Sequence, residues 1–253
     1  MKIFLSALET NKSVVHKILK LTKLRYSLVS YFYVRKNPEA FKLILDNSDE
    51  VLIDSGAYSF QVKGGKTDWE GYTREYAAFI RMWDCPKIVG YFEMDIDVLV
   101  GYEKVLQLRK ILERETNKII PVWHKNRGID EFKRMCDEYK GRIVSISGLE
   151  NRDIDPKDYG KFYNYAHNRG CLMHCLGMTK RSILDAVPFD YVDSASWKIQ
   201  SVYGKANGKQ VCSSYRRTNY EEVMVANYVK WKQVQEHYYN KYRNIHKYPP
   251  LRQ

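Results

Sequence analysis

Residues 88–123 read IVGYFEMDIDVLVGYEKVLQLRKILERETNKIIPVW, and this stretch decides the fold. It opens with a short β-type apolar run at Ile88–Met94 and continues with helically spaced apolar residues over Tyr102–Glu115. A second β-type run, Ile119–Trp123, closes it. Two strands separated by a helix predict a parallel β-α-β unit, because parallel strands need a crossover connection.

The same alternation is repeated along the whole chain. The remaining β-type runs are Lys2–Ser6, Ser27–Val34, Glu50–Ile53, Ile143–Ile146, Cys171–Leu176 and Tyr191–Val192. Helical spacing recurs at Ser13–Leu21, Pro38–Leu45, Asp68–Met82, Ile129–Tyr139, Pro156–Asn168 and Lys180–Val187, and a long final helix is expected at Tyr220–Tyr242. Eight β-α units predict an α/β fold, a (β/α)8 TIM barrel forming a single domain over residues 1–253. An open doubly wound sheet is the alternative, because strand closure cannot be read from one sequence.

The hydrophobic content, net charge and cysteine count of the chain limit the classes of protein to which it can belong. The chain has 253 residues with 44% hydrophobic residues, which excludes a disordered protein, and a net charge of +12, which favours nucleic acid as a partner over a membrane surface. We find neither a spanning apolar stretch nor a secretory signal pattern. Five cysteines, an odd number lying mostly in apolar stretches, predict free thiols in a cytoplasmic protein.

The positive charge is concentrated after the eighth strand. Residues 197–253 hold 11 Lys and Arg against 3 Asp and Glu. Five of these cations, with Trp197, Tyr203 and Tyr215 among them, lie in the expected loop Ser194–Asn219: Lys198, Lys205, Lys209, Arg216 and Arg217. Basic residues interleaved with aromatic ones are typical of a groove that binds a nucleic-acid strand. A merely solvated basic loop is the alternative.

Polar residues follow the expected strands, where barrel enzymes keep their chemistry. The third strand runs into Asp54-Ser55-Gly56-Ala57-Tyr58, the fourth into Glu93-Met94-Asp95-Ile96-Asp97, and the fifth into Trp123-His124. The sixth runs into Ser147-Gly148-Leu149, the seventh contains His174, and the eighth ends in Asp193-Ser194. An aspartate after a strand is commonly a helix cap, but Asp54, Asp95 and Asp193 at matching positions of three strands predict a shared site.

Residues 54–58 resemble the Asp-Ser-Gly-Gly-(Phe/Tyr) motif of the tRNA-guanine transglycosylases. Further similarities follow in the family's order: Met94-Asp95 to its guanine-reading segment, Ser147-Gly148-Leu149 to its Gly-Gly-Leu loop, Leu172–Gly177 to its Met-Gly-Val-Gly strand, and 191–194 to its nucleophile strand. The resemblance spans about residues 50–195. It implies guanine exchange by a retaining double displacement.

The resemblance also implies the residue roles. Asp193 matches the nucleophile, and Asp54 matches the carboxylate that moves the proton. Asp95 would read the guanine edge and Tyr58 would stack on the base. The remaining residues expected around the base are Ser55, Gly56, Trp123, His124, Ser147, Gly148, Leu149 and His174. Asp97 either shares the Asp95 pocket or caps the next helix.

Departures from the family pattern point to one of its branches. The zinc-binding cysteines are missing, since Cys212 stands alone after the nucleophile strand, and Cys171, His174 and Cys175 are expected to be strand residues on alternating faces. We therefore expect no metal and no cofactor. A compact chain of this kind resembles the DpdA-type, often phage-encoded transglycosylases that insert 7-deazaguanines into DNA. The expected partners are DNA, with tRNA as the alternative, and a free 7-deazaguanine base as co-substrate; a non-catalytic nucleic-acid-binding barrel is the other reading.

Overall fold

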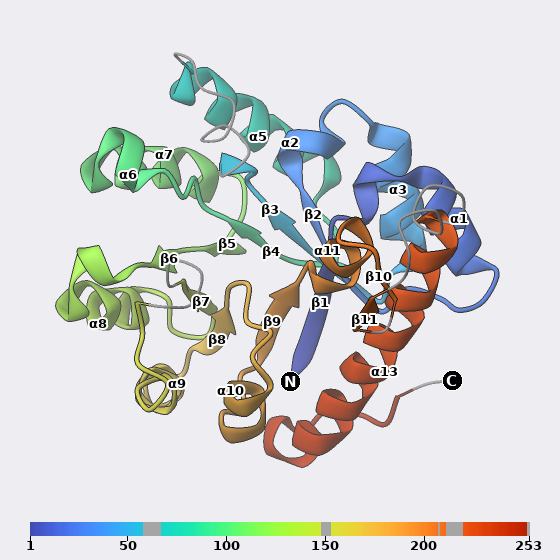
Figure 1. Cartoon of the computed structure of the whole chain (residues 1–253). Coiled ribbons are helices and arrows are strands. Elements are labelled where there is room, and N and C mark those ends of the chain that lie inside the picture. Colours follow the sequence, from blue (N-terminus) through green and yellow to red (C-terminus); the bar gives the residue numbers. More distant parts are fainter. Residues whose placement is uncertain (58–66, 148–152, 207, 211–219, 252–253) are drawn as a thin grey trace.

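A computed structural model describes residues 1–57, 67–147, 153–206, 208–210 and 220–251 (Figure 1). Its main sheet has nine parallel strands in the order β5-β4-β3-β2-β1-β9-β8-β7-β6. These strands are β1 (Lys2–Ser6), β2 (Tyr26–Ser30), β3 (Glu50–Asp54), β4 (Ile88–Phe92), β5 (Ile119–Ile120), β6 (Val122–Trp123), β7 (Ile143–Ile146), β8 (Leu172–Cys175) and β9 (Tyr191–Ser194). They form a nearly closed barrel with helices around it, which confirms the predicted TIM-barrel fold.

The two ends of the sheet meet in the single expected strand 119–123. Its first half, β5, pairs with β4, whereas its second half, β6, pairs with β7. Pro121, between the halves, has no N–H to donate. The segment therefore changes neighbours at the proline and joins the two edges of the sheet.

Helices cover the outside of the barrel (Figure 1). Those that match expected helices are α1 (Lys12–Leu19), α3 (Pro38–Asn47), α5 (Trp69–Trp83), α7 (Tyr102–Glu113), α8 (Ile129–Glu138), α9 (Tyr159–Asn168), α10 (Arg181–Ala186) and α13 (Tyr220–His246). Three of them begin at a side-chain cap: Asn11, Asn37 and Asp68 each accept a backbone N–H three residues further on. These polar caps fix where the helices start.

The structure differs from the sequence-based expectation at two further places. The expected strand Ser27–Val34 ends at Ser30, and its aromatic end forms the short helix α2 (Tyr31–Val34), where the Tyr31 ring stacks on Tyr76 of α5 with centroids 4.7 Å apart. The expected loop Ser194–Asn219 contains helix α11 (Ser196–Val202) and a hairpin of β10 (Lys205–Ala206) and β11 (Lys209–Gln210). Small further elements are η1 (Leu8–Thr10), α6 (Asp97–Val100) and η2 (Lys125–Arg127).

Strand alternation separates two apolar layers. Side chains that fill the barrel form one cluster, which includes Phe4, Leu52, Phe92 and Tyr191. Their strand neighbours, such as Ile3 and Ile53, belong to the larger cluster under the helices. Because side chains alternate with period two, the residues two positions beyond Leu52 and Tyr191 also face inward. Those residues are Asp54 and Asp193, at the carboxyl end of the barrel.

The final helix α13 packs along β1 and β2. Its Gln235 side chain is buried and donates hydrogen bonds from Nε2 to the carbonyl oxygens of Ile3, at 2.6 Å, and Tyr26, at 3.1 Å. Tyr239, one turn later, joins the interior cluster of the barrel. No helix in the described part of the chain, the 27-residue α13 included, is both long and apolar enough to cross a membrane.

Candidate active site at the barrel mouth

Asp54 and Asp193 lie at the ends of β3 and β9, and each is held by a backbone N–H. Gly56 donates to Asp54 Oδ2 at 2.9 Å, and Gly177 donates to Asp193 Oδ1 at 2.7 Å. Asp193 is only 8% exposed. Both carboxylates are therefore fixed at the inner rim of the barrel by the first residues of a loop.

Gly56 is required for this arrangement. Its φ of +77° is favourable only for glycine, and a Cβ at this position would lie 2.4 Å from Phe32 Cβ and 2.8 Å from Ser30 Oγ. The chain after β3 thus passes so close to the end of β2 that only a hydrogen fits. The motif glycine keeps its N–H directed at Asp54.

Both carboxyl groups hold a proton more tightly than an ordinary aspartate. Burial raises the pKa of Asp193 to about 7, and the charge of Asp54 adds to the effect while the Gly177 N–H opposes it. Burial likewise raises the pKa of Asp54 to about 6, with a further contribution from the charge of Asp95 against the Gly56 N–H. Both carboxyl groups therefore titrate closer to neutral pH than an ordinary aspartate does.

His174 of β8 faces Asp193 inside the barrel. Its Nε2 is 3.6 Å from Asp193 Oδ1, and its Nδ1 is 3.1 Å from the Ser145 hydroxyl. Burial lowers the pKa of His174 to about 3, so the ring is neutral. Nε2 is buried without a hydrogen-bond partner among the described residues. The neutral imidazole thus lies beside the Asp193 carboxyl group without a hydrogen bond to it.

A third buried carboxyl, Glu9 of η1, was not expected from the sequence. Its Oε1 accepts the Ser30 N–H at 3.2 Å, and its Oε2 is buried without a partner in the described structure. Burial raises the pKa of Glu9 to about 7 against the hydrogen bonds and the charge of Lys198, while the charge of Asp54 adds to the increase. Its only sequence signal was a carboxylate shortly after the first strand. Glu9 thus belongs to the rim beside Asp54.

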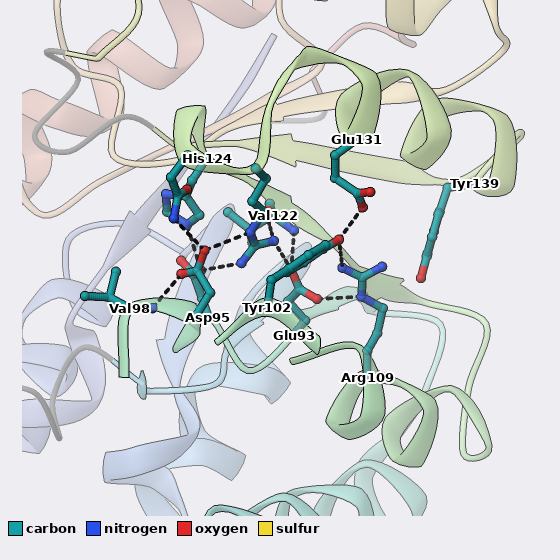
Figure 2. A network of polar contacts seen from close by, with 12 residues as sticks. Glu93, Asp95, Val98, Tyr102, Arg109, Val122, His124, Glu131 and Tyr139 are labelled. Carbon is teal, nitrogen blue, oxygen red and sulfur yellow. Dashed lines mark hydrogen bonds and ion pairs between the residues drawn. The ribbon is translucent and has the colours of Figure 1, made fainter. Parts of the chain in front are cut away.

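Asp95 lies in a polar network after β4 (Figure 2). Its Oδ1 contacts His124 Nε2 at 2.7 Å and Arg127 Nη2 at 3.3 Å, whereas its Oδ2 has no partner within the described ranges. Burial opposes protonation of His124, but the hydrogen bond and charge of Asp95 outweigh it and raise the pKa of the imidazole. One carboxylate oxygen is therefore anchored, and the other is left to accept a hydrogen bond.

Arg127 of η2 connects this network and was also missed by the sequence analysis. Its side chain is 1% exposed and lies over the Tyr102 ring, 4.4 Å from the centroid. It pairs with Glu93, Asp95 and Asp97, the last at 3.0 Å from Nε. Burial acts to raise the pKa of the Asp97 carboxyl group, but the hydrogen bond and charge of Arg127 outweigh it, so the pKa is lowered. Asp97 thus anchors Arg127 as well as beginning α6.

The neighbouring Glu93 is fully buried and joins the two edges of the sheet. Its Oε1 accepts the backbone N–H of Val122 at 2.8 Å, and its Oε2 accepts Nε of Arg109 at 2.5 Å (Figure 2). A buried carboxylate with this many charged partners is stable only while all of them stay in place. The pair fixes the position of the Asp95 loop relative to β6.

The same cluster contains three side chains of types that ligate metal ions. Ligand atoms of Asp95, Asp97 and His124 lie within 4.8 Å of one another in the described structure. The guanidinium of Arg127 already contacts both carboxylates. Its positive charge occupies the position that would favour a cation, so we assign no metal to the cluster.

Of the other residues expected around the base, some lie near the barrel mouth, one points away from it, and three lie outside the described residues. Ser55 is fully buried, and Ser147 follows β7, with its N–H donated to the Trp123 carbonyl at 2.9 Å. The expectation for Trp123 itself is wrong: its ring packs against Phe132 and Phe162 outside the barrel, because alternation turns it away from the interior. Tyr58, Gly148 and Leu149 lie outside the described residues.

The basic residues after β9 occupy α11 and the hairpin. Lys198 of α11 contacts Thr10 Oγ1 at 2.6 Å, and Lys205 and Lys209 are exposed on β10 and β11. Trp197 is fully buried with its Nε1 bonded to the Ser6 carbonyl at 2.8 Å, so it anchors α11 and is not a stacking surface. Arg216, Arg217, Tyr215 and Cys212 lie outside the described residues.

Comparisons with known proteins add little to this geometry. No family model matches the sequence, and no curated protein matches it. A solved structure from Aquifex aeolicus VF5, described only as a structural study, is 13% identical and gives a TM-score of 0.43 over 90% of this chain and 93% of that one. A likeness this weak carries no functional argument. The chemistry must therefore be argued from the barrel mouth itself.

Proposed function

We propose that this chain is a base-exchange transglycosylase that replaces guanine in DNA with a 7-deazaguanine through an aspartyl-glycosyl intermediate. The observation that carries the proposal is the pair Asp54 and Asp193, two inward carboxyl groups with raised pKa values at one rim. Base exchange without a strand break needs one carboxylate nucleophile and one carboxylic acid side by side. Asp54 and Asp193 offer two carboxyl groups at one rim for these two roles.

The reaction follows from these two groups. The Asp193 carboxylate attacks C1′ of the nucleotide as the bond from C1′ to the guanine nitrogen breaks, and the departing guanine takes the proton of Asp54. The incoming base then gives a proton to Asp54 and attacks C1′, which breaks the ester to Asp193. The anionic oxygen of Asp193 also stabilises the positive charge that develops on the sugar.

Asp95 supports selection of guanine over adenine. Its Oδ1 is held by His124 and Arg127, which leaves Oδ2 free to accept a hydrogen bond from the N–H groups on the guanine edge. Adenine has no donor at its N1 position. A hydrogen-bonding site of this kind rejects a base that leaves its groups unpaired.

Unpaired cations beside Asp193 support a polynucleotide substrate. Among the described residues that surround β9 and α11, six cations have no carboxylate within ion-pair distance: Lys180, Arg181, Lys198, Lys205, Lys209 and Lys230. The elements that carry the last three are tied together, because Asn227 of α13 donates to the Lys205 carbonyl at 2.9 Å. Cations without internal partners are suited to phosphate groups.

The proposal is tested by incubating the protein with isotope-labelled guanine and either DNA or tRNA, followed by mass analysis of the nucleosides. We expect label in deoxyguanosine, and none after Asp193→Asn, because an amide cannot form the covalent ester. A matched control is Asp185→Asn, an exposed carboxylate on α10 that pairs with Lys241.

Three results would count against the proposal. Exchange within about tenfold of the native rate in Asp193→Asn, equal to roughly 1.4 kcal/mol of barrier, would remove the nucleophile assignment. Label in tRNA alone would move the activity to the tRNA-modifying enzymes. Binding of DNA without any exchange would indicate a non-catalytic barrel.

A further inference from the structure

A pocket of about 350 Å³ opens between α10, α11 and α13, beside the proposed nucleophile. Thr179, on its wall, comes two residues after Gly177, which donates its N–H to Asp193. Ser196, on another wall, follows Asp193 by three residues. The pocket is therefore adjacent to the barrel mouth without being part of the base site described above.

We infer that this pocket binds the nucleotide that neighbours the exchanged guanine in the same strand, an inference that rests on the proposed function. A strand whose sugar is attacked by Asp193 must continue past the carboxylate on both sides. The pocket lies where such a strand would leave the mouth over α11.

The charge of the pocket fits a phosphate. Arg181 and Lys230 line it, and neither has a carboxylate partner among the described residues; Lys230 Nζ contacts only the amide oxygen of Gln233, at 3.2 Å. On the same two helices, Lys241 and Asp185 are paired at 2.6 Å. Arg181 and Lys230 thus stand on the wall of the pocket without such an ion pair.

The remaining lining fits a base and a sugar. Trp231 is partly buried on α13 and supplies an aromatic wall, and Gln200 and Ser196 supply hydrogen-bonding groups from α11. An aromatic ring beside cations is the combination that single-strand-binding proteins use, stacking the base on the ring while the cations hold the backbone. A volume of 350 Å³ is within the ~300–1,000 Å³ range of small-ligand pockets, so it suits a nucleotide rather than a duplex.

The test uses 5′-phosphorylated dithymidylate, which carries no guanine and therefore reports on this pocket apart from the base site. Binding is followed by quenching of tryptophan fluorescence at several salt concentrations. The native chain should bind, and the double variant Arg181→Ala/Lys230→Ala should bind at least about fivefold more weakly with a smaller salt slope. Trp231→Phe should lose the quenching but keep part of the affinity when binding is measured by titration calorimetry, because phenylalanine still stacks. Arg114→Ala, an exposed cation at the end of α7, is the matched control.

The outcome separates this inference from the proposed function. Equal dithymidylate affinity in the native chain and in the double variant would overturn the inference, even if guanine exchange proceeds. Competition by inorganic phosphate as strong as that of dithymidylate would overturn it too, because the base would then contribute nothing. Absence of guanine exchange alongside specific dithymidylate binding would refute the proposed activity and leave the nucleotide pocket in place. In an active enzyme, the double variant should raise KM for an oligonucleotide at least fivefold and leave kcat nearly unchanged.

Discussion

Asp193→Asn should make the protein more stable at neutral pH. In the unfolded chain an aspartate has a pKa of 3.8, whereas burial raises the pKa of Asp193 to about 7 in the fold. The folded state therefore binds the proton more tightly. Its stability falls as the pH rises from about 4 to 7, because the carboxyl group must ionise inside the barrel. Asparagine has the same shape, still accepts the Gly177 N–H, and never ionises.

The size of this effect follows from the two pKa values. A difference between 3.8 and about 7, at about 1.36 kcal/mol for each pH unit, gives on the order of 4 kcal/mol at pH 8 and close to zero at pH 4. Asp54 and Glu9 also have raised pKa values, so the pH dependence of the native chain is shared among three groups. Only the difference between the variant and the native chain isolates Asp193.

The assay is urea unfolding of both proteins at several pH values between 4 and 8. The free energy of unfolding of the variant should exceed that of the native chain by an amount that grows with pH. Asp185→Asn is the control, since Lys241 lowers the pKa of that carboxyl group and no gain is expected. A difference that is the same at pH 4 and pH 8, or a variant less stable at pH 8, would refute the reasoning.

Three further predictions concern the rest of the site. Gly56→Ala should lower the free energy of unfolding by about 1–3 kcal/mol or more, measured by urea unfolding, because a Cβ would clash with the end of β2 at a φ of +77°; native stability would contradict this. Arg109→Met should cost about 3–5 kcal/mol in the same measurement, because the fully buried Glu93 loses a charged partner, and Arg109→Lys should recover part of the loss. Lys205→Ala/Lys209→Ala should weaken DNA binding in fluorescence anisotropy and reduce the salt slope by about 0.7–0.9 per lost phosphate contact; an unchanged slope would show that the hairpin is only solvated.

The sequence predicted the barrel because its signals are local. Apolar runs of period two and spacings of a helix turn recur often enough to count eight units, and alternation along β3 and β9 places Asp54 and Asp193 on the inner face. The strand end at Ser30 was missed because Tyr31–Val34 has the composition of a strand. The Tyr31 ring instead packs against Tyr72, Tyr76 and Phe79 of α5, a contact that is distant in sequence.

The sequence predicted only those site residues that can be recognised from their own type and position in the chain. Carboxylates after strands can be found by position, whereas Arg127 matters through three acids up to 34 residues away in the chain. Trp197 was misread for the same reason, since only its bond to Ser6, 191 positions earlier, shows that it is buried. Partners that distant leave no pattern in a single sequence.

The segment 119–123 has a mechanical consequence for the mouth of the barrel. β5 and β6 are each only two residues long and contribute two paired positions each, and the Glu93 side chain accepts the Val122 N–H. The barrel is thus closed at the segment 119–123 by few hydrogen bonds, one of which is accepted by a side chain. Local opening of the barrel should therefore begin at the segment 119–123. Such opening would widen the mouth beside Asp95 and His124. A bulky base would then enter there without deformation of the rest of the barrel.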